Sequence, residues 1–219
     1  MPAPHLATVN VGTIRAVPWR SANRTAIDKR PALGPVAART LGLEGDQIGD
    51  TKHHGGVDQA VYAYAREDLD RWQELLGRDL RNGQFGENLT TVGVDVTGAV
   101  IGERWQIGTA VLEVAVPRIP CGTFRDFMDE PRWVRRFTEE GRPGAYLRVV
   151  QEGVLAAGDT VRVGERPEHG LTVGATFRAM TGNRELTTRL LEAPQLPAKV
   201  RDNARQVLSS PPATGRNLA

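Results

Sequence analysis

A chain of 219 residues, 40% of them hydrophobic, is long enough for one main core and a small appendage, because single cores grow to roughly 200–250 residues in β-rich folds. Its 28 basic and 26 acidic side chains leave a formal charge of +2, so net charge gives no support for binding to nucleic acid or to an anionic membrane. The single cysteine excludes an internal disulfide, a multi-cysteine zinc site and a four-cysteine iron–sulfur cluster.

The chain also lacks the sequence features of an exported or membrane-anchored protein. No apolar run approaches the roughly 18 residues that a membrane span needs, and the first residues lack the charged and apolar regions of a signal peptide. We therefore expect a cytoplasmic protein. Without cysteines for an iron–sulfur relay, any electrons that it uses must come from an external donor.

Short segments with strand character recur between Gly, Pro and Asp residues, a spacing typical of a sheet or barrel. The clearest are residues 8–11, 60–64, 87–91, 110–116, 145–150 and 160–163. Two helices are predicted between them. Arg66–Leu76 has apolar residues on one helical face and ends before Gly77. The second helix begins near Pro131, has Asp129 as a candidate N-terminal cap, and ends before Gly141.

The pattern changes after residues 166–170. From Thr172 onward the apolar residues fall at helical spacing, and breaks at 182–183 and 194–197 divide the segment into three short helices. This segment is too small to fold alone, so we expect it to dock on the main domain or on a partner. The predicted organisation is a main domain over 1–166, a three-helix segment over 171–209 and a disordered tail over 210–219.

The lone cysteine, Cys121, follows the predicted strand 110–116 within Pro117-Arg118-Ile119-Pro120-Cys121-Gly122. Two prolines stiffen the chain and a glycine follows the thiol, which favours a sulfur presented from a loop at a strand end. Arg118 could hold the thiolate form, which is both the nucleophile and the metal ligand. The alternative is a cysteine that serves only as a small buried apolar residue.

A second candidate segment, residues 50–58, contains His53, His54, Gly55 and Gly56 directly before a predicted strand. The paired glycines allow close backbone approach to a ligand, and the histidines with a neighbouring lysine supply donors suited to phosphate. Adjacent histidines in an extended chain point to opposite faces, so they are a poor chelating pair by themselves. An ordinary turn with a surface histidine is the alternative.

Two further segments supply candidates for ligand contact. Asn88 lies near the start of the predicted strand 87–91, where its amide could either brace the turn or orient a heteroaromatic ligand. Lys29 and Arg24 lie in an early basic segment and are candidates for contact with an anion. Surface solvation is the alternative for both cations.

Several short segments occur in one order along the chain. They are Val9-Asn10-Val11-Gly12, Val17-Pro18-Trp19, Gly45-Asp46, His54-Gly55-Gly56-Val57-Asp58, Ala60-Val61-Tyr62-Ala63-Tyr64, Phe85-Gly86-Glu87-Asn88-Leu89-Thr90, Ile107-Gly108-Thr109-Ala110 and Pro117-Arg118-Ile119-Pro120-Cys121. In this order they closely resemble the MOSC domain, named after the C-terminal domain of molybdenum cofactor sulfurase, and within it the stand-alone YiiM-like subgroup. The resemblance covers about residues 7–165, and the helical tail is similar to the three-helix segment of that subgroup.

The resemblance implies a mainly β fold, a MOSC-type β-barrel with a few helices, that binds the molybdenum cofactor (molybdopterin). Cys121 matches the position of the family's protein ligand to the metal. The residue types agree, because a pterin phosphate needs cationic donors and glycine backbone, while a sulfur-bound metal accepts another soft thiolate. The cofactor-binding residues implied by position are Arg24, Lys29, His54, Gly55, Gly56, Asn88, Arg118 and Cys121.

The activity implied by the resemblance is reduction of N-hydroxylated nucleobases or hydroxylamines at a cysteine-ligated molybdenum centre, with Cys121 and His54 as catalytic residues. Expected partners are a small N-hydroxylated substrate and an external flavin or iron–sulfur electron-donor protein. Nucleic acid and membranes are not expected, and a homodimer is left open. Sulfur transfer through a persulfide on Cys121 is the alternative enzyme class, and a non-catalytic cofactor carrier is the third interpretation.

Overall fold

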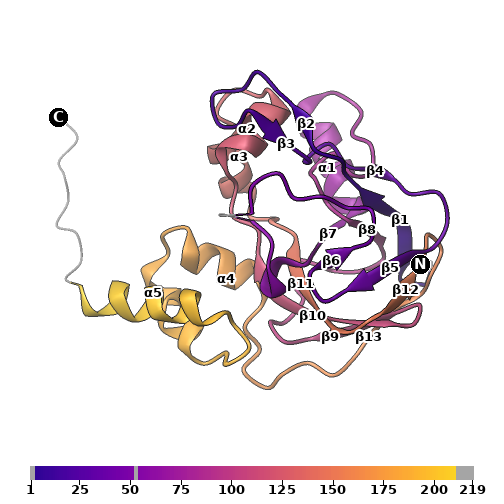
Figure 1. Cartoon of the computed structure of the whole chain (residues 1–219). Coiled ribbons are helices and arrows are strands. Elements are labelled where there is room, and N and C mark those ends of the chain that lie inside the picture. Colours follow the sequence, from indigo (N-terminus) through magenta and orange to yellow (C-terminus); the bar gives the residue numbers. More distant parts are fainter. Residues whose placement is uncertain (1–2, 52–53, 211–219) are drawn as a thin grey trace.

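The computed structural model describes residues 3–51 and 54–210. Its main feature is an eight-stranded sheet whose buried side chains contribute to the main hydrophobic core, and the ribbon shows that this sheet is curled (Figure 1). The strand order is β13 (Val161–Val163), β9 (Arg104–Ile107), β10 (Ala110–Pro117), β11 (Ala145–Gln151), β7 (Val61–Ala65), β8 (Leu89–Val92), β1 (His5–Val11) and β4 (Arg30–Pro31). Neighbouring strands are antiparallel, except that β7 and β8 are parallel. All six strands predicted from the sequence are confirmed, with shifted ends.

Two small sheets complete the β structure. A three-stranded sheet has the order β12 (Gly153–Leu155), β5 (Val36–Arg39) and β6 (Gly42–Leu43), and a hairpin pairs β2 (Arg15–Ala16) with β3 (Arg24–Thr25). Val36, Leu43 and Leu155 of the three-stranded sheet are buried in the main hydrophobic core. The three-stranded sheet therefore covers part of the core. The β2–β3 hairpin instead borders a surface pocket.

The expected mainly β barrel is wrong in two respects. About 27% of the structure is helix and 27% is strand, and the large sheet is open from β13 to β4. Its ends approach each other where His5 of β1 forms one isolated antiparallel bridge with Thr160, and where Leu6 N donates to Asp159 O at 2.9 Å. Among the described residues this is the single bridge between β1 and the segment before β13, so no continuous ladder closes the sheet there. The fold is mixed α/β.

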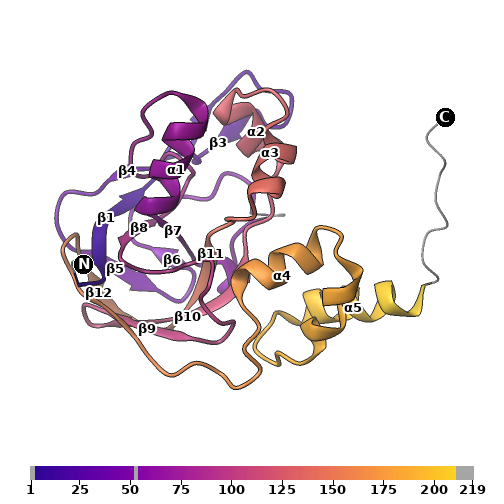
Figure 2. The ribbon, with the colours of Figure 1, turned by 180° about the vertical axis from the view of Figure 1, so that it is seen from behind.

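Three helices pack together at one end of the sheet (Figure 2). The predicted helix α1 (Arg66–Leu76) is confirmed, and Gly77 ends it in the left-handed conformation. α2 (Gly122–Met128) was not predicted, and α3 (Trp133–Glu140) starts two residues later than expected. The cap assignment of Asp129 is wrong, because this residue ends α2 with φ 50° and donates its N–H to Arg125 O.

An aromatic cluster holds these helices against the sheet. It is built from buried rings of α1, α2, α3 and the turn before β8, among them Trp72, Phe85, Phe124, Trp133 and Phe137. The ring centroids of Trp72 and Trp133 are 4.7 Å apart, and those of Phe85 and Phe124 are 5.2 Å apart. Burying each large side chain contributes roughly 1.5–3 kcal/mol, so the start of α2 has a fixed position relative to β8.

The C-terminal segment is helical, as expected, but its middle helix is replaced by two 3₁₀ turns. Its elements are α4 (Val173–Met180), η2 (Arg184–Leu186), η3 (Thr188–Leu191) and α5 (Ala198–Ser209). The Thr172 hydroxyl caps α4 by accepting a hydrogen bond from Ala175 N at 3.1 Å. Val173 packs in the main core and Phe177 in the aromatic cluster. The predicted tail beyond residue 210 lies outside the described residues.

Within residues 3–51 and 54–210, none of the helices combines the length and apolar character that crossing a bilayer requires. The division into a main domain and a docked segment stays a prediction.

Candidate functional site

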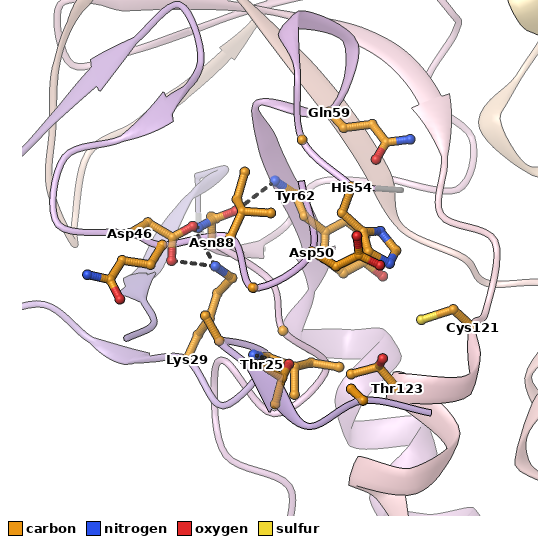
Figure 3. Close-up of a pocket in the computed structure, with 18 of the residues that line it drawn as sticks. Thr25, Lys29, Asp46, Asp50, His54, Gln59, Tyr62, Asn88, Cys121 and Thr123 are labelled. Carbon is orange, nitrogen blue, oxygen red and sulfur yellow. Dashed lines mark hydrogen bonds and ion pairs between the residues drawn. The ribbon is translucent and has the colours of Figure 1, made fainter. Parts of the chain in front are cut away.

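A pocket lies between the β2–β3 hairpin, the turn before η1 (Val57–Gln59), the start of β7 and the start of α2 (Figure 3). Seven of the eight residues implied by the family resemblance line it: Arg24, Lys29, His54, Gly55, Asn88, Arg118 and Cys121. The eighth, Gly56, is not among its lining residues. Segments separated by about a hundred residues in the chain therefore converge on one cavity.

Cys121 is the residue directly before α2, in an extended conformation with φ −118°. Its side chain is only partly buried and faces the pocket (Figure 3). Burial raises the pKa of the Cys121 thiol, but a hydrogen bond with His54, the charge of Arg118 and a hydrogen bond from the Phe124 backbone outweigh it and lower the pKa to about 6. The side chain is therefore a thiolate at neutral pH, which is the reactive and metal-binding form.

His54 is presented to the pocket by a tight turn. Its backbone N–H donates to Asp50 O at 3.0 Å, and the next residue, Gly55, has φ 87°. A Cβ atom at Gly55 would lie 2.6 Å from Ile48 Cδ1 and would be strained at this φ, so the turn requires glycine. His53 lies outside the described residues.

Arg118 is buried beneath the pocket with 5% of its surface exposed. Its guanidinium lies over the rings of Tyr62 and Phe124, at 5.0 and 4.0 Å from their centroids, and donates to Phe85 O. Among the described residues, no carboxylate forms an ion pair with it. The aromatic faces compensate part of the desolvation of this cation, and the remaining field favours an anion in the pocket.

Lys29, by contrast, already has an anionic partner. Its ammonium forms a buried ion pair with Asp46, whose carboxylate also accepts from Gly12 N at 2.7 Å and from Asn88 Nδ2 at 2.8 Å (Figure 3). Burial lowers the pKa of Lys29, although Asp46 opposes this effect. The charge of Lys29 is thus largely neutralised within the protein, and its contact with a ligand stays a prediction.

Both the oxygen and the nitrogen of the Asn88 side-chain amide form hydrogen bonds within the protein. Its Oδ1 accepts from Tyr62 N at 3.1 Å, and its Nδ2 also contacts Asn10 O at 3.2 Å. These bonds tie β7, β8 and β1 together beneath the pocket. They favour the bracing role that the sequence left open, while a contact with a ligand remains a prediction.

The pocket's rim is formed by the β2–β3 hairpin, which carries the exposed Arg24. The turn of this hairpin is joined to α2, because Ser21 donates from its N–H and its hydroxyl to Asp126 at 3.1 and 2.5 Å. The rings of Trp19 and Phe127 are also 6.0 Å apart. The hairpin therefore covers one side of the Cys121 pocket.

The sequence did not reveal three further lining residues, Gln59, Tyr62 and Tyr146. Tyr146 of β11 is in register with Tyr62 of β7 on one side and with Val116 of β10 on the other. The centroids of the two tyrosine rings are 5.1 Å apart, their planes are tilted by 38°, and together they form an aromatic part of the wall. Tyr62 lies in a segment that carries the family resemblance, but strand register, which the local sequence does not specify, places Tyr62 and Tyr146 side by side in the wall.

Comparison with known proteins adds independent information. The model of the family described as the MOSC domain matches residues 50–162. YiiM of Escherichia coli is 30% identical over 152 residues, which are 68% of this chain and 67% of that protein. A protein named "Reductase" from Gibberella moniliformis is 31% identical over 215 residues, which are 95% of this chain. The chain spans only 38% of the length of that relative.

The similarity extends to three dimensions. The crystal structure of YiiM from Geobacillus stearothermophilus aligns with a TM-score of 0.77 at 27% identity, and covers 94% of this chain and 100% of that one. The family model includes His54, Asn88, Arg118 and Cys121, so most of the pocket lies inside the matched region. The family resemblance seen in the sequence is confirmed: this chain belongs to the MOSC domain family, and YiiM proteins are among its relatives.

Proposed function

We propose that this protein is a molybdenum-cofactor-dependent oxidoreductase that reduces N-hydroxylated nucleobases or hydroxylamines with electrons from an external flavin or iron–sulfur protein. The observation that carries the proposal is the thiolate of Cys121 beside His54 and a buried Arg118 that has no carboxylate partner among the residues that the structure describes. Two comparisons support it, since MOSC domains are associated with the molybdenum cofactor and one relative is named a reductase.

The pocket offers the donor types that this cofactor needs. The Cys121 thiolate is a soft ligand suited to a metal already bound by sulfur. Arg118 supplies positive charge close to it, and the positive-φ backbone at Gly55 permits close approach of a ligand. The chemistry that the cofactor supplies when bound is removal of an oxygen atom from the substrate, with two electrons returned by an outside donor.

The protein's own residues have distinct parts in this proposal. Cys121 anchors the metal, and Arg118 holds anionic groups in place. His54 moves a proton through its imidazole, whose two ring nitrogens can donate and accept hydrogen bonds. The balanced reaction is R–NHOH + 2 e⁻ + 2 H⁺ → R–NH₂ + H₂O, so the site must deliver two protons for each pair of electrons.

The test uses full-length protein made in a host that synthesises the cofactor. We expect bound molybdenum, and we expect an N-hydroxylated purine to be reduced with a reduced viologen dye or with NADPH plus a flavin reductase. NADPH alone should give no turnover, because the chain has one cysteine and no dinucleotide-binding fingerprint. If molybdenum-loaded protein with a low-potential donor reduces none of a panel of N-hydroxylated bases, amidoximes and hydroxylamines, the proposal is wrong.

Sulfur transfer is a second candidate, favoured by the lowered pKa of Cys121. The thiolate would attack the outer sulfur of a donor persulfide: R–S–S⁻ + Cys–S⁻ + H⁺ → Cys–S–S⁻ + R–SH. Intact-mass measurement after treatment with a small persulfide should then show one added sulfur atom that is absent from Cys121→Ser. Molybdenum binding with neither turnover nor sulfur uptake would instead indicate a cofactor carrier.

A further inference from the structure

Gln59 presents an unused hydrogen-bond acceptor within the pocket. It is the last residue of η1, one residue before the start of β7, and its side chain lies on the same pocket wall as His54 (Figure 3). Its carbonyl oxygen Oε1 is buried and has no hydrogen-bond partner among residues 3–51 and 54–210. A buried carbonyl oxygen without a donor costs free energy. A ligand that donates a hydrogen bond to it in the pocket would remove this cost.

The other amides of the pocket do not share this feature. Three carboxamides line the cavity: Gln47, Gln59 and Asn88. Gln47 Oε1 accepts from Ile14 N at 2.7 Å, and Asn88 Oδ1 accepts from Tyr62 N at 3.1 Å. Gln59 alone among these three holds its oxygen without a donor.

The backbone of Gln59 is held firmly, which argues against an incidental position. Its N–H donates to Gly56 O at 3.1 Å within η1. The preceding residue, Asp58, forms an ion pair with Arg148 of β11, and Arg148 also donates to Gln195 O at 2.8 Å. The turn is thus fixed to the sheet and to the C-terminal segment, so the Gln59 amide is anchored at the pocket wall.

The surroundings of this acceptor suit a flat ring. The rings of Tyr62 and Tyr146, with centroids 5.1 Å apart, line the same pocket as Gln59. Aromatic faces and a carboxamide are the combination by which proteins recognise the edge of a heteroaromatic ring, as glutamine does with adenine.

We propose that Gln59 Oε1 accepts a hydrogen bond from a ring N–H or exocyclic amino group of a heteroaromatic ligand in this pocket, and that Gln59 is therefore a specificity-determining residue. The inference rests on the proposed function and deepens it. The ring has two chemically equivalent sources, the pterin of the cofactor and the purine or pyrimidine of an N-hydroxylated substrate. The experiment distinguishes them.

The variants are Gln59→Met, which keeps the side-chain length but removes the acceptor, and Gln59→Glu, which keeps an acceptor oxygen. The matched control is Gln106→Met, because Gln106 is an exposed residue of β9 outside the pocket. In protein made without the cofactor, Gln59→Met should not lower the midpoint of thermal unfolding, since no protein hydrogen bond to Oε1 is lost. A lower midpoint in Gln59→Met, but not in Gln106→Met, would show a structural role and overturn the proposal.

Two binding measurements on protein from a cofactor-producing host then identify the ring. The first measures pterin and molybdenum retained through purification, and the second measures binding of adenine to loaded protein by equilibrium dialysis. In Gln59→Met we expect about a tenfold loss in one of them, the usual effect of one buried hydrogen bond to a ligand. Loss of retention assigns the ring to the cofactor, whereas loss of adenine binding alone assigns it to the substrate. Gln59→Glu should recover part of the lost binding.

A third measurement is the steady-state kinetics of the same variants. If the ring belongs to the substrate, Gln59→Met should raise the KM for an N-hydroxylated purine about tenfold and leave the KM for hydroxylamine itself unchanged. Unchanged retention and unchanged adenine binding in Gln59→Met would overturn the proposal. Failure of the reductase function would appear separately, as absence of turnover in the parent protein, and the two binding measurements would still decide the role of Gln59.

Discussion

Replacing His54 by alanine should raise the pKa of Cys121. The hydrogen bond with His54 and the electrostatic effect of its imidazole are two of the contributions that lower the thiol pKa from 9.0 to about 6, and burial opposes them. With His54 removed, Arg118 and the Phe124 N–H remain as the favourable contributions. We therefore expect the pKa in the variant to lie between these two values, and at least about one unit above that of the parent.

The consequence at neutral pH is large. A thiol with a pKa of about 6 is roughly nine-tenths thiolate at pH 7, whereas one with a pKa of about 8 is roughly one-tenth thiolate. Because each pKa unit corresponds to about 1.4 kcal/mol, His54→Ala should remove at least that much stabilisation of the thiolate. Cofactor-free protein should then react more slowly with iodoacetamide at pH 7.

The assay is the rate of alkylation of the single cysteine between pH 4 and 10, with thiolate absorbance near 240 nm as a second measurement. The Cys121 thiol should titrate near pH 6 in the parent and at higher pH in His54→Ala. The control variant Gln106→Met, at an exposed residue outside the pocket, should titrate like the parent. Identical titration curves for parent and His54→Ala would refute the argument that His54 sets the state of Cys121.

The same pKa predicts the sign of a stability effect. Because the pKa of Cys121 is lower in the folded protein than in the unfolded chain, its contribution is complete above about pH 9, falls as the pH decreases, and is lost below about pH 6. At pH 7 it amounts to about 1.4 kcal/mol. Denaturant unfolding of cofactor-free protein should show this pH dependence in the parent, and Cys121→Ser should lack it.

Three further predictions concern single contacts. Cys121→Ser should keep the fold but lose most of the bound molybdenum, because a neutral hydroxyl is a poor ligand for a soft metal; equal metal content by elemental analysis would exclude Cys121 from coordination. Lys29→Ala should lower the free energy of unfolding by about 3–5 kcal/mol, because it leaves the buried Asp46 unpaired; a change below about 1 kcal/mol in denaturant titration would contradict this. Phe177→Ala should cost about 3–5 kcal/mol in one cooperative transition, since its ring packs in the aromatic cluster; two separate transitions in calorimetry would instead support independent folding of the C-terminal segment.

Local sequence patterns were sufficient for much of the fold. The six predicted strands and α1 are present because alternating or helically spaced apolar residues determine which face is buried, and glycine determines where α1 ends. α2 was missed because its seven residues begin with a glycine directly after a segment with two prolines, a pattern that is typical of a loop. The closed barrel was wrong because closure depends on a ladder between β1 and the segment before β13, which local patterns do not specify.

The sequence by itself determined the candidate chemistry of the site: a single cysteine near an arginine, and a His-Gly-Gly segment, in an order that resembles one family. Only the tertiary structure decided how these residues act. It pairs Lys29 with Asp46, places Arg118 over the rings of Tyr62 and Phe124, and lowers the pKa of Cys121 through His54. The physical reason is that hydrogen bonds, burial and ion pairs depend on distances between side chains far apart in the chain, and strand register and helix packing set those distances.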